Sequence, residues 1–148
     1  MLTRLIYHSE NHLGAADGKM IAPLNAIMDA SIRNNERDGI TGALLADTLW
    51  FVQILEGERE TVSVALARIM RDPRHDAVTV MDCRPIGERQ FGNWWMGLAS
   101  LKRADPALLQ RLGIVKFDPR RMSAEQVLTV ATALADIGLS RRLTPPAA

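Results

Sequence analysis

The pattern of apolar and polar positions predicts strands and helices that alternate along the first hundred residues. Residues 2–8 alternate as a strand does, residues 51–57 form a second run of strand-forming residues, and Leu24, Ile27 and Met28 recur at helical spacing. The predicted strands are 2–8, 39–46, 51–57, 78–84 and 94–98, and the predicted helices are 22–37 and 58–70. This order is the split β-α-β arrangement of a ferredoxin-like α+β fold with about five strands, and it predicts both helices on one face of the sheet.

The last third of the chain reads as a helical extension. Asp105 precedes a short helix that ends near Gly113, and Ser123 with Gln126 forms a capping box that opens a longer helix ending at Gly138. These helices are expected to cover either the other face of the sheet or a partner. The chain is therefore predicted to comprise residues 1–100 as the main domain, 101–140 as a C-terminal helical extension, and 141–148 as a disordered tail.

Composition narrows the possible functions. The 148 residues are 47% hydrophobic and carry a net charge of +1, so neither nucleic acid nor a membrane is an expected partner. Cys83 is the only cysteine, which excludes an internal disulfide and fits a cytoplasmic location. None of the three histidines, His8, His12 and His75, lies on a predicted helix, so no metal site is predicted. Phosphate-binding loops and nucleophile elbows are also missing from the sequence.

Three neutral hydrogen-bonding side chains are candidates for a common site. Tyr7 and Gln53 lie on predicted strands, and Asn35 falls on the line of Leu24 along the first helix. Each has an ordinary alternative: Gln53 faces solvent or bonds to a nearby loop, Asn35 faces solvent, and the Tyr7 hydroxyl reaches water. Together, a phenol and two carboxamides on one core face require a common polar partner, and a flat heterocycle with ring carbonyls and nitrogens would supply one.

The sequence resembles a BLUF domain, a blue-light sensor that uses flavin adenine dinucleotide (FAD). The motifs that carry the resemblance are LIYHS at 5–9, SIRNN at 31–35, GITG at 39–42, FVQILEG at 51–57, DPRH at 72–75, RQF at 89–91 and WWMG at 94–97. Each motif is weak alone, but the ordered set covers roughly the first hundred residues and is specific.

The resemblance implies a role for each candidate residue. Tyr7 would give an electron and a proton to the flavin in light, and Gln53, which bridges the phenol and the flavin N5 and C4-carbonyl edge, would rotate or tautomerise. Asn35 would bond to the C4-carbonyl and N3 edge, and Asn34 would also contact the flavin. The other implied flavin contacts are Ile27, Ser31, Arg68, Asp72, Arg74 and His75, of which Arg74 and His75, expected in a loop, would reach the C2-carbonyl side or the ribityl chain.

The resemblance also suggests how the signal leaves the site. Trp94 and Met96 match the strand that the family uses to relay the glutamine rearrangement, and Trp95 departs from the small residue often found there. The sequence leaves open which of Trp94 and Met96 faces the flavin. No effector domain follows in the sequence, so the chain is expected to be a photosensor and not an enzyme. It would signal to a separate partner protein and form a homo-oligomer, with the helices from Pro106 onward as the contact surface.

Two other functions are compatible with the predicted fold. A small acylphosphatase-like hydrolase has the same fold, but it holds phosphate with an arginine in the loop after the first strand, and residues 9–19 contain no arginine. A ligand-free interaction domain would keep the fold without flavin, although the presence of Tyr7, Asn35 and Gln53 argues against it.

Overall fold

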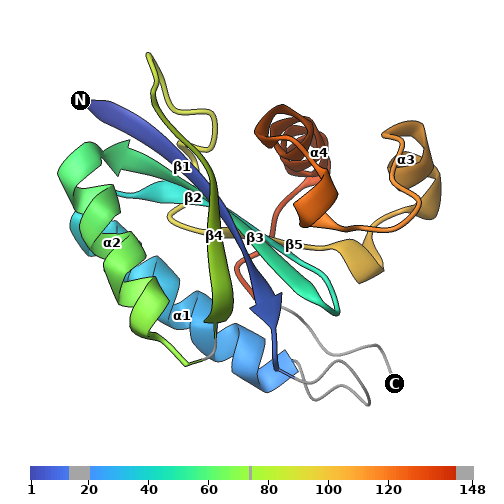
Figure 1. Cartoon of the computed structure of the whole chain (residues 1–148), viewed down its shortest axis with the longest axis horizontal. Helices are drawn as coiled ribbons and strands as arrows, with labels where there is room; N and C mark the ends of the chain where they lie inside the picture. Colours follow the sequence, from blue (N-terminus) through green and yellow to red (C-terminus); the bar gives the residue numbers. More distant parts are fainter. Residues whose placement is uncertain (14–20, 74, 143–148) are drawn as a thin grey trace.

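A five-stranded sheet with helices on both faces forms the framework of the molecule (Figure 1). The computed structural model describes residues 1–13, 21–73 and 75–142, so Arg74 and residues 143–148, most of the predicted disordered tail, lie outside the described residues. The elements are β1 (Leu2–Asn11), α1 (Ile21–Asp38), β2 (Thr41–Ala46), β3 (Trp50–Glu58), α2 (Arg59–Arg71), β4 (His75–Pro85), β5 (Gly97–Ser100), η2 (Leu101–Arg103), α3 (Pro106–Arg111), η3 (Pro119–Arg121) and α4 (Ala124–Ile137).

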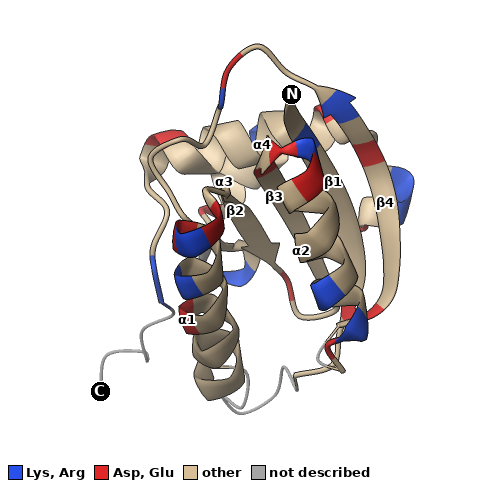
Figure 2. Ribbon diagram, turned by 90° about the vertical axis from the view of Figure 1, so that its left-hand side faces the viewer, with Lys and Arg blue, Asp and Glu red and all other residues tan. Residues whose placement is uncertain are grey.

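The strand order β4-β1-β3-β2-β5 confirms the ferredoxin-like prediction. Strands β1, β2, β3 and β4 pair antiparallel, and β5 adds to β2 in parallel. Helices α1 and α2 pack side by side on one face, as predicted (Figure 2). Their core includes Leu24, Met28, Phe51 and Leu55, which are all almost fully buried.

Two predicted boundaries are wrong in ways that matter for the site. The last strand was expected at 94–98, but β5 begins at Gly97, so Trp94 and Met96 precede it. The apolar run suggested a strand, yet parallel pairing with β2 starts only where Gly97 lies opposite Ala43. His75 was expected in a loop but begins β4, because β1 continues past His8 to Asn11 and pairs with it.

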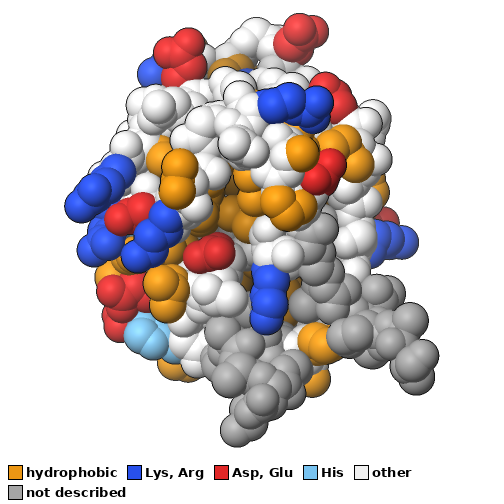
Figure 3. Space-filling model, turned by 90° about the vertical axis from the view of Figure 1, so that its right-hand side faces the viewer, with side chains coloured by type: hydrophobic (Ala, Val, Ile, Leu, Met, Phe, Trp, Pro, Cys, Tyr) orange, Lys and Arg blue, Asp and Glu red, His pale blue; other side chains and the backbone are white. Residues whose placement is uncertain are grey.

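The C-terminal helices cover the opposite face of the sheet and enclose a second core. Of the two predicted positions for these helices, the sheet face is therefore confirmed. Val127, Val130 and Leu134 of α4 pack with Val52 and Ile54 of β3. The predicted caps are present: the Asp105 side chain accepts from the Ala107 N–H, and Ser123 and Gln126 form a reciprocal capping box. Figure 3 views the molecule from the side that carries these helices. None of the helices in the described part of the chain combines the length and apolar character needed to cross a membrane.

A buried histidine lies beneath this second layer. His8 on β1 is only 8% exposed, and its ring meets Trp50 edge to face at 5.9 Å. Its Nδ1 has no hydrogen-bond partner among the described residues. Arg120 of η3 covers the other ring, 4.7 Å from the Trp50 centroid. Burial lowers the pKa of His8 below its ordinary value of 6.5; the Asp118 charge opposes this shift, and Arg120 adds to it.

This histidine should make stability depend on pH. As pH falls through 6.5 the unfolded chain takes up a proton at His8, but the folded protein, with its lowered pKa, does not. The free energy of unfolding should therefore decrease between about pH 7 and pH 5, and the loss should end once the folded form is also protonated. Urea unfolding at several pH values measures this slope. His8→Gln should flatten it, whereas His12→Gln, at an exposed position, should not. An identical slope in wild type and His8→Gln would contradict the assignment.

Candidate functional site

The centre of the candidate site is a buried pair formed by Tyr7 and Gln53. The antiparallel register of β1 and β3 places the two residues directly opposite each other, so both side chains point toward α1 and α2. Tyr7 is 0% exposed and Gln53 4% exposed. The Tyr7 hydroxyl donates a hydrogen bond to Gln53 Oε1. The alternatives in which Gln53 faces solvent or the Tyr7 hydroxyl reaches water are therefore wrong.

The surroundings of Tyr7 keep its phenol protonated. Burial raises the pKa of Tyr7 far above its ordinary value, and the negative charge of Asp72 raises it further. A phenolate is thus disfavoured at any physiological pH. The phenol acts as a hydrogen-bond donor, and loss of an electron from this ring must be accompanied by loss of its proton to the hydrogen-bonded Gln53 side.

Met96 occupies the other side of the Gln53 carboxamide. Gln53 Nε2 donates to Met96 Sδ over 3.5 Å, and Met96 is 1% exposed. Trp94 is partly buried and packs against the second core, on the other face of the sheet. Trp95 is 39% exposed. The structure therefore places Met96, and not Trp94, beside the glutamine.

Asn35 links helix α1 to the segment that carries Met96. Its side chain is 4% exposed, which excludes the solvent-facing alternative and confirms the prediction from helical spacing. Asn35 Nδ2 donates to the Trp95 carbonyl oxygen at 2.7 Å. This bond uses one of its two donors, and the side-chain oxygen retains its capacity to accept.

A cavity of about 160 Å³ opens between α1 and α2 next to this pair. Most of the predicted site residues line it: Ile27, Ser31, Asn34, Asn35, Gln53, Arg68, Asp72 and His75. The remaining lining residues, Ala30, Ala65 and Ile69, were not predicted as site residues. Ala65 and Ile69 stand on the apolar stripe of α2, and their spacing identified them only as core. The guanidinium of Arg68, one of the lining residues, lies 3.6 Å from the carboxylate of Asp38.

His75 closes the β-strand side of this region. Its ring lies 5.5 Å from that of Phe51 and 6.4 Å from that of Tyr7, and its Nδ1 lies 3.3 Å from Ser9 Oγ. Because His75 is the first residue of β4, its backbone is fixed by the sheet and not by a loop.

The cavity lining fits one edge and the faces of a flavin ring. Ile27, Ala65 and Ile69 offer apolar surfaces for a flat ring. Asn34, Asn35 and Gln53 offer carboxamides, which can each donate and accept, and flavin carries alternating ring carbonyls and nitrogens along one edge. A set of neutral amides over apolar walls is the donor set that such a heterocycle requires.

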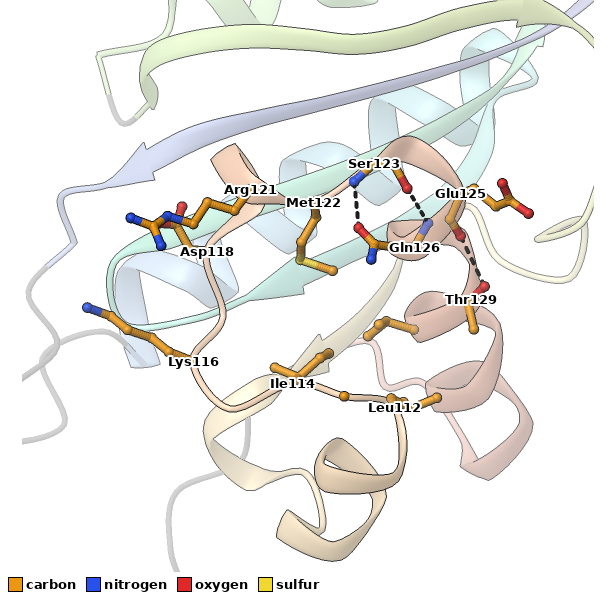
Figure 4. Close-up of a pocket in the computed structure, with 12 residues that line it drawn as sticks. Leu112, Ile114, Lys116, Asp118, Arg121, Met122, Ser123, Glu125, Gln126 and Thr129 are labelled. Carbon is orange, nitrogen blue, oxygen red and sulfur yellow. Dashed lines mark hydrogen bonds and ion pairs between the residues drawn. The ribbon is translucent and has the colours of Figure 1, made fainter.

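A larger cavity of about 410 Å³ lies elsewhere, between α4 and the segment that follows α3 (Figure 4). Most of its polar side chains already have a partner within the protein. Ser123 and Gln126 bond to each other in the capping box, Thr129 Oγ1 donates to the Glu125 carbonyl, and Asp118 holds Arg120. It therefore lacks converging unused amides, and the cavity between α1 and α2 is the stronger candidate.

Comparison with known proteins identifies the family of this chain. Residues 2–97 match the family described as sensors of blue light using FAD (BLUF). The blue light- and temperature-regulated antirepressor BluF of Escherichia coli is 33% identical over 102 residues, which are 69% of this chain and 24% of that protein. The photoactivated adenylate cyclase subunit beta of Euglena gracilis is 42% identical over 72 residues, 49% of this chain but 8% of that protein. This chain thus spans only a small part of these relatives.

Solved structures agree with the sequence comparison. The dark-state structure of the BLUF protein BlrB matches with a TM-score of 0.70 and 35% identity, covering 91% of this chain and 96% of BlrB. The ground state of BlsA matches with a TM-score of 0.77 and 25% identity, covering 90% and 87% of the two chains. These relatives give no support to the hydrolase alternative. The chain belongs to the BLUF family of blue-light sensors that use FAD.

Proposed function

We propose that this chain holds FAD non-covalently between α1 and α2 and responds to blue light through Tyr7 and Gln53. The observation that carries the proposal is the buried hydrogen bond between these two side chains beside a cavity lined with carboxamides. Asn35 and Asn34 would hold the polar edge of the ring, Asn35 at the C4-carbonyl and N3 side. Ile27, Ser31, Arg68, Asp72, Arg74 and His75 would complete the flavin contacts.

When bound, the flavin absorbs blue light and supplies an electron acceptor. Tyr7 is the proposed donor of the electron. Its proton leaves with the electron because burial disfavours every charged form of the ring, and the hydrogen bond to Gln53 Oε1 gives the proton a path. Both return to Tyr7 when the dark state is restored, so the chain undergoes no net chemical change.

Gln53 is the proposed switch. Rotation about its last side-chain torsion exchanges Oε1 and Nε2, so that Nε2 faces the Tyr7 oxygen and Oε1 faces Met96 Sδ. In a water-excluded site, exchange of these bonds is costly to reverse, which gives the rearranged state a lifetime. Met96 would respond to the rotation of Gln53. Because Trp94 lies two residues before Met96, it would carry this movement away from the site.

We further propose that the signal passes to a separate protein. Two of the relatives are an antirepressor and a photoactivated adenylate cyclase subunit, and these activities belong to those larger proteins. Here residues 1–100 would form the flavin-binding domain and residues 101–140 the contact surface for a partner or for a second copy of the chain. Hydrophobic side chains are visible on the side of the molecule drawn in Figure 3, and they suit such a contact. Within residues 101–140, Val115 and Ile137 are exposed. A cytoplasmic location, without nucleic acid or membrane partners, fits the net charge of +1.

The purified protein should be yellow, with flavin absorption bands that shift to the red under blue light and return in darkness. Retention of the colour after purification, with release of FAD on denaturation, would show non-covalent binding. Absorption spectra before, during and after illumination measure the reversible shift. A colourless protein that does not take up added FAD, or a flavoprotein whose bands do not move, would contradict the proposal.

A further inference from the structure

A buried carboxylate lies on the face of β3 opposite to Gln53. Glu56 is 0% exposed, and strand alternation points it away from α1 and α2. It accepts hydrogen bonds from the backbone N–H groups of Gln90, at 3.0 and 3.1 Å, and Phe91, at 2.8 Å. Arg4 Nε, on β1, donates to it at 3.2 Å. Gln90 and Phe91 belong to the loop of residues 86–96, which joins β4 to β5. Because charge-assisted hydrogen bonds are stronger than neutral ones, Glu56 fixes the position of this loop.

Arg89 fastens the same loop to the ends of β2 and β3. Its guanidinium donates to the Glu56 carbonyl oxygen at 2.8 Å, to Thr41 Oγ1 at 2.9 Å and to the Gly39 carbonyl oxygen at 2.8 Å. Three consecutive residues, Arg89, Gln90 and Phe91, are therefore bound to one place on the sheet. None of these groups takes part in the chemistry assigned to Tyr7 and Gln53.

The anchored loop ends at Met96. It joins β4 to β5, and beyond the anchor its backbone is held by the bond from the Gly42 N–H to the Trp94 carbonyl, at 3.0 Å, and by the bond from Asn35 to Trp95. Met96 Sδ then lies 3.5 Å from Gln53 Nε2. How firmly the sulfur is held against the glutamine depends on how firmly the loop is held on the sheet.

The sulfur discriminates between the two orientations of Gln53. A thioether accepts a weak hydrogen bond but has no hydrogen to donate. With Nε2 toward Met96 the contact is favourable; after rotation, Oε1 faces an atom that offers it no bond. A rigid loop keeps this unfavourable contact in place, whereas a loosened loop allows Met96 to move away.

We propose that Glu56 is a positioning residue that sets the lifetime of the rearranged state, by holding the loop that places Met96 against Gln53. The inference rests on the proposed function, because it concerns the return of Gln53 after light. Glu56 touches neither the cavity nor the Tyr7 hydroxyl, so its effect is on the rate of return and not on flavin binding or the size of the light-induced shift.

Glu56→Gln tests this assignment. The new side chain keeps one acceptor oxygen, but its NH₂ group would face either Arg4 Nε or the N–H groups of Gln90 and Phe91, so at least one bond is lost and the loop would loosen. Flavin content and the light-induced red shift should stay at wild-type levels, while dark recovery should be about fivefold slower, a change expected from loss of one to two hydrogen bonds. Glu58→Gln, on the same strand but exposed and paired with the N-terminal amine, should recover at the wild-type rate.

Arg89→Gln provides a second route to the same result, because it releases the loop without altering Glu56. It should also slow recovery, and it keeps the proposal testable if Glu56→Gln does not fold. Wild-type recovery rates in the folded variants, even with a lowered melting temperature, would show a purely structural role and overturn the inference. A wild-type protein without any reversible shift would instead contradict the proposed function itself.

Discussion

Gln53→Leu is expected to bind flavin and to lose the light-induced red shift completely. Leucine fills a similar volume but has no group that accepts from Tyr7 or exchanges donor and acceptor. Asn34 and Asn35 remain to hold the ring edge, so flavin binding should survive. The Tyr7 hydroxyl loses its partner in a buried place, which should cost about 1–3 kcal/mol of stability. Absorption difference spectra, recorded with and without blue light at equal flavin content, measure the loss.

Two further variants make this result specific. Tyr7→Phe removes the donor side of the same hydrogen bond and should also keep the flavin and abolish the shift. Gln110→Leu makes the same substitution at an exposed position on α3 and should shift as wild type does. A normal reversible shift in Gln53→Leu or Tyr7→Phe would rule out the roles assigned to this pair.

Local periodicity was enough to predict part of the site. Asn35 lies eleven residues after Leu24 on one helix, so helical geometry placed it on the core-facing stripe, but the structure was needed to exclude a solvent-facing side chain. Tyr7 and Gln53 were assigned to faces by strand alternation, but their contact also requires the β1–β3 register, which two-residue periodicity alone does not determine. The resemblance supplied that link, and the structure confirms the contact.

Other parts depend on contacts between segments that lie far apart in the sequence. The run of Trp94, Trp95 and Met96 has the composition of a strand, but its three side chains go to different places: the second core, the surface, and Gln53. The buried role of Glu56 was also hidden, because a glutamate at the end of an apolar run usually faces water. Its charge is satisfied by Arg4 on β1 and by the loop that folds back over it, 34 residues later in the case of Gln90.

Gly42→Ala is expected to cause the largest loss of stability among the substitutions considered. A Cβ at position 42 would lie 1.9 Å from the carbonyl oxygen of Ile54 and 3.0 Å from its carbonyl carbon. Those atoms belong to the backbone of β3 and cannot rotate away. Strands β2 and β3 would have to separate locally, and the bond from the Gly42 N–H to the Trp94 carbonyl would be strained as well.

The cost should reach about 3 kcal/mol, at the upper end of what overpacking a core causes. For a chain of this length that corresponds to a fall in melting temperature of roughly 6–12 °C. Thermal unfolding followed by circular dichroism measures it. Gly87→Ala is the matched control, because nothing lies within 4 Å of a Cβ there, and it should melt as wild type does. If the two variants melted alike, the close approach of β2 to β3 at Gly42 would be disproved, and with it the reason why this strand pair tolerates only glycine next to the segment that carries Met96.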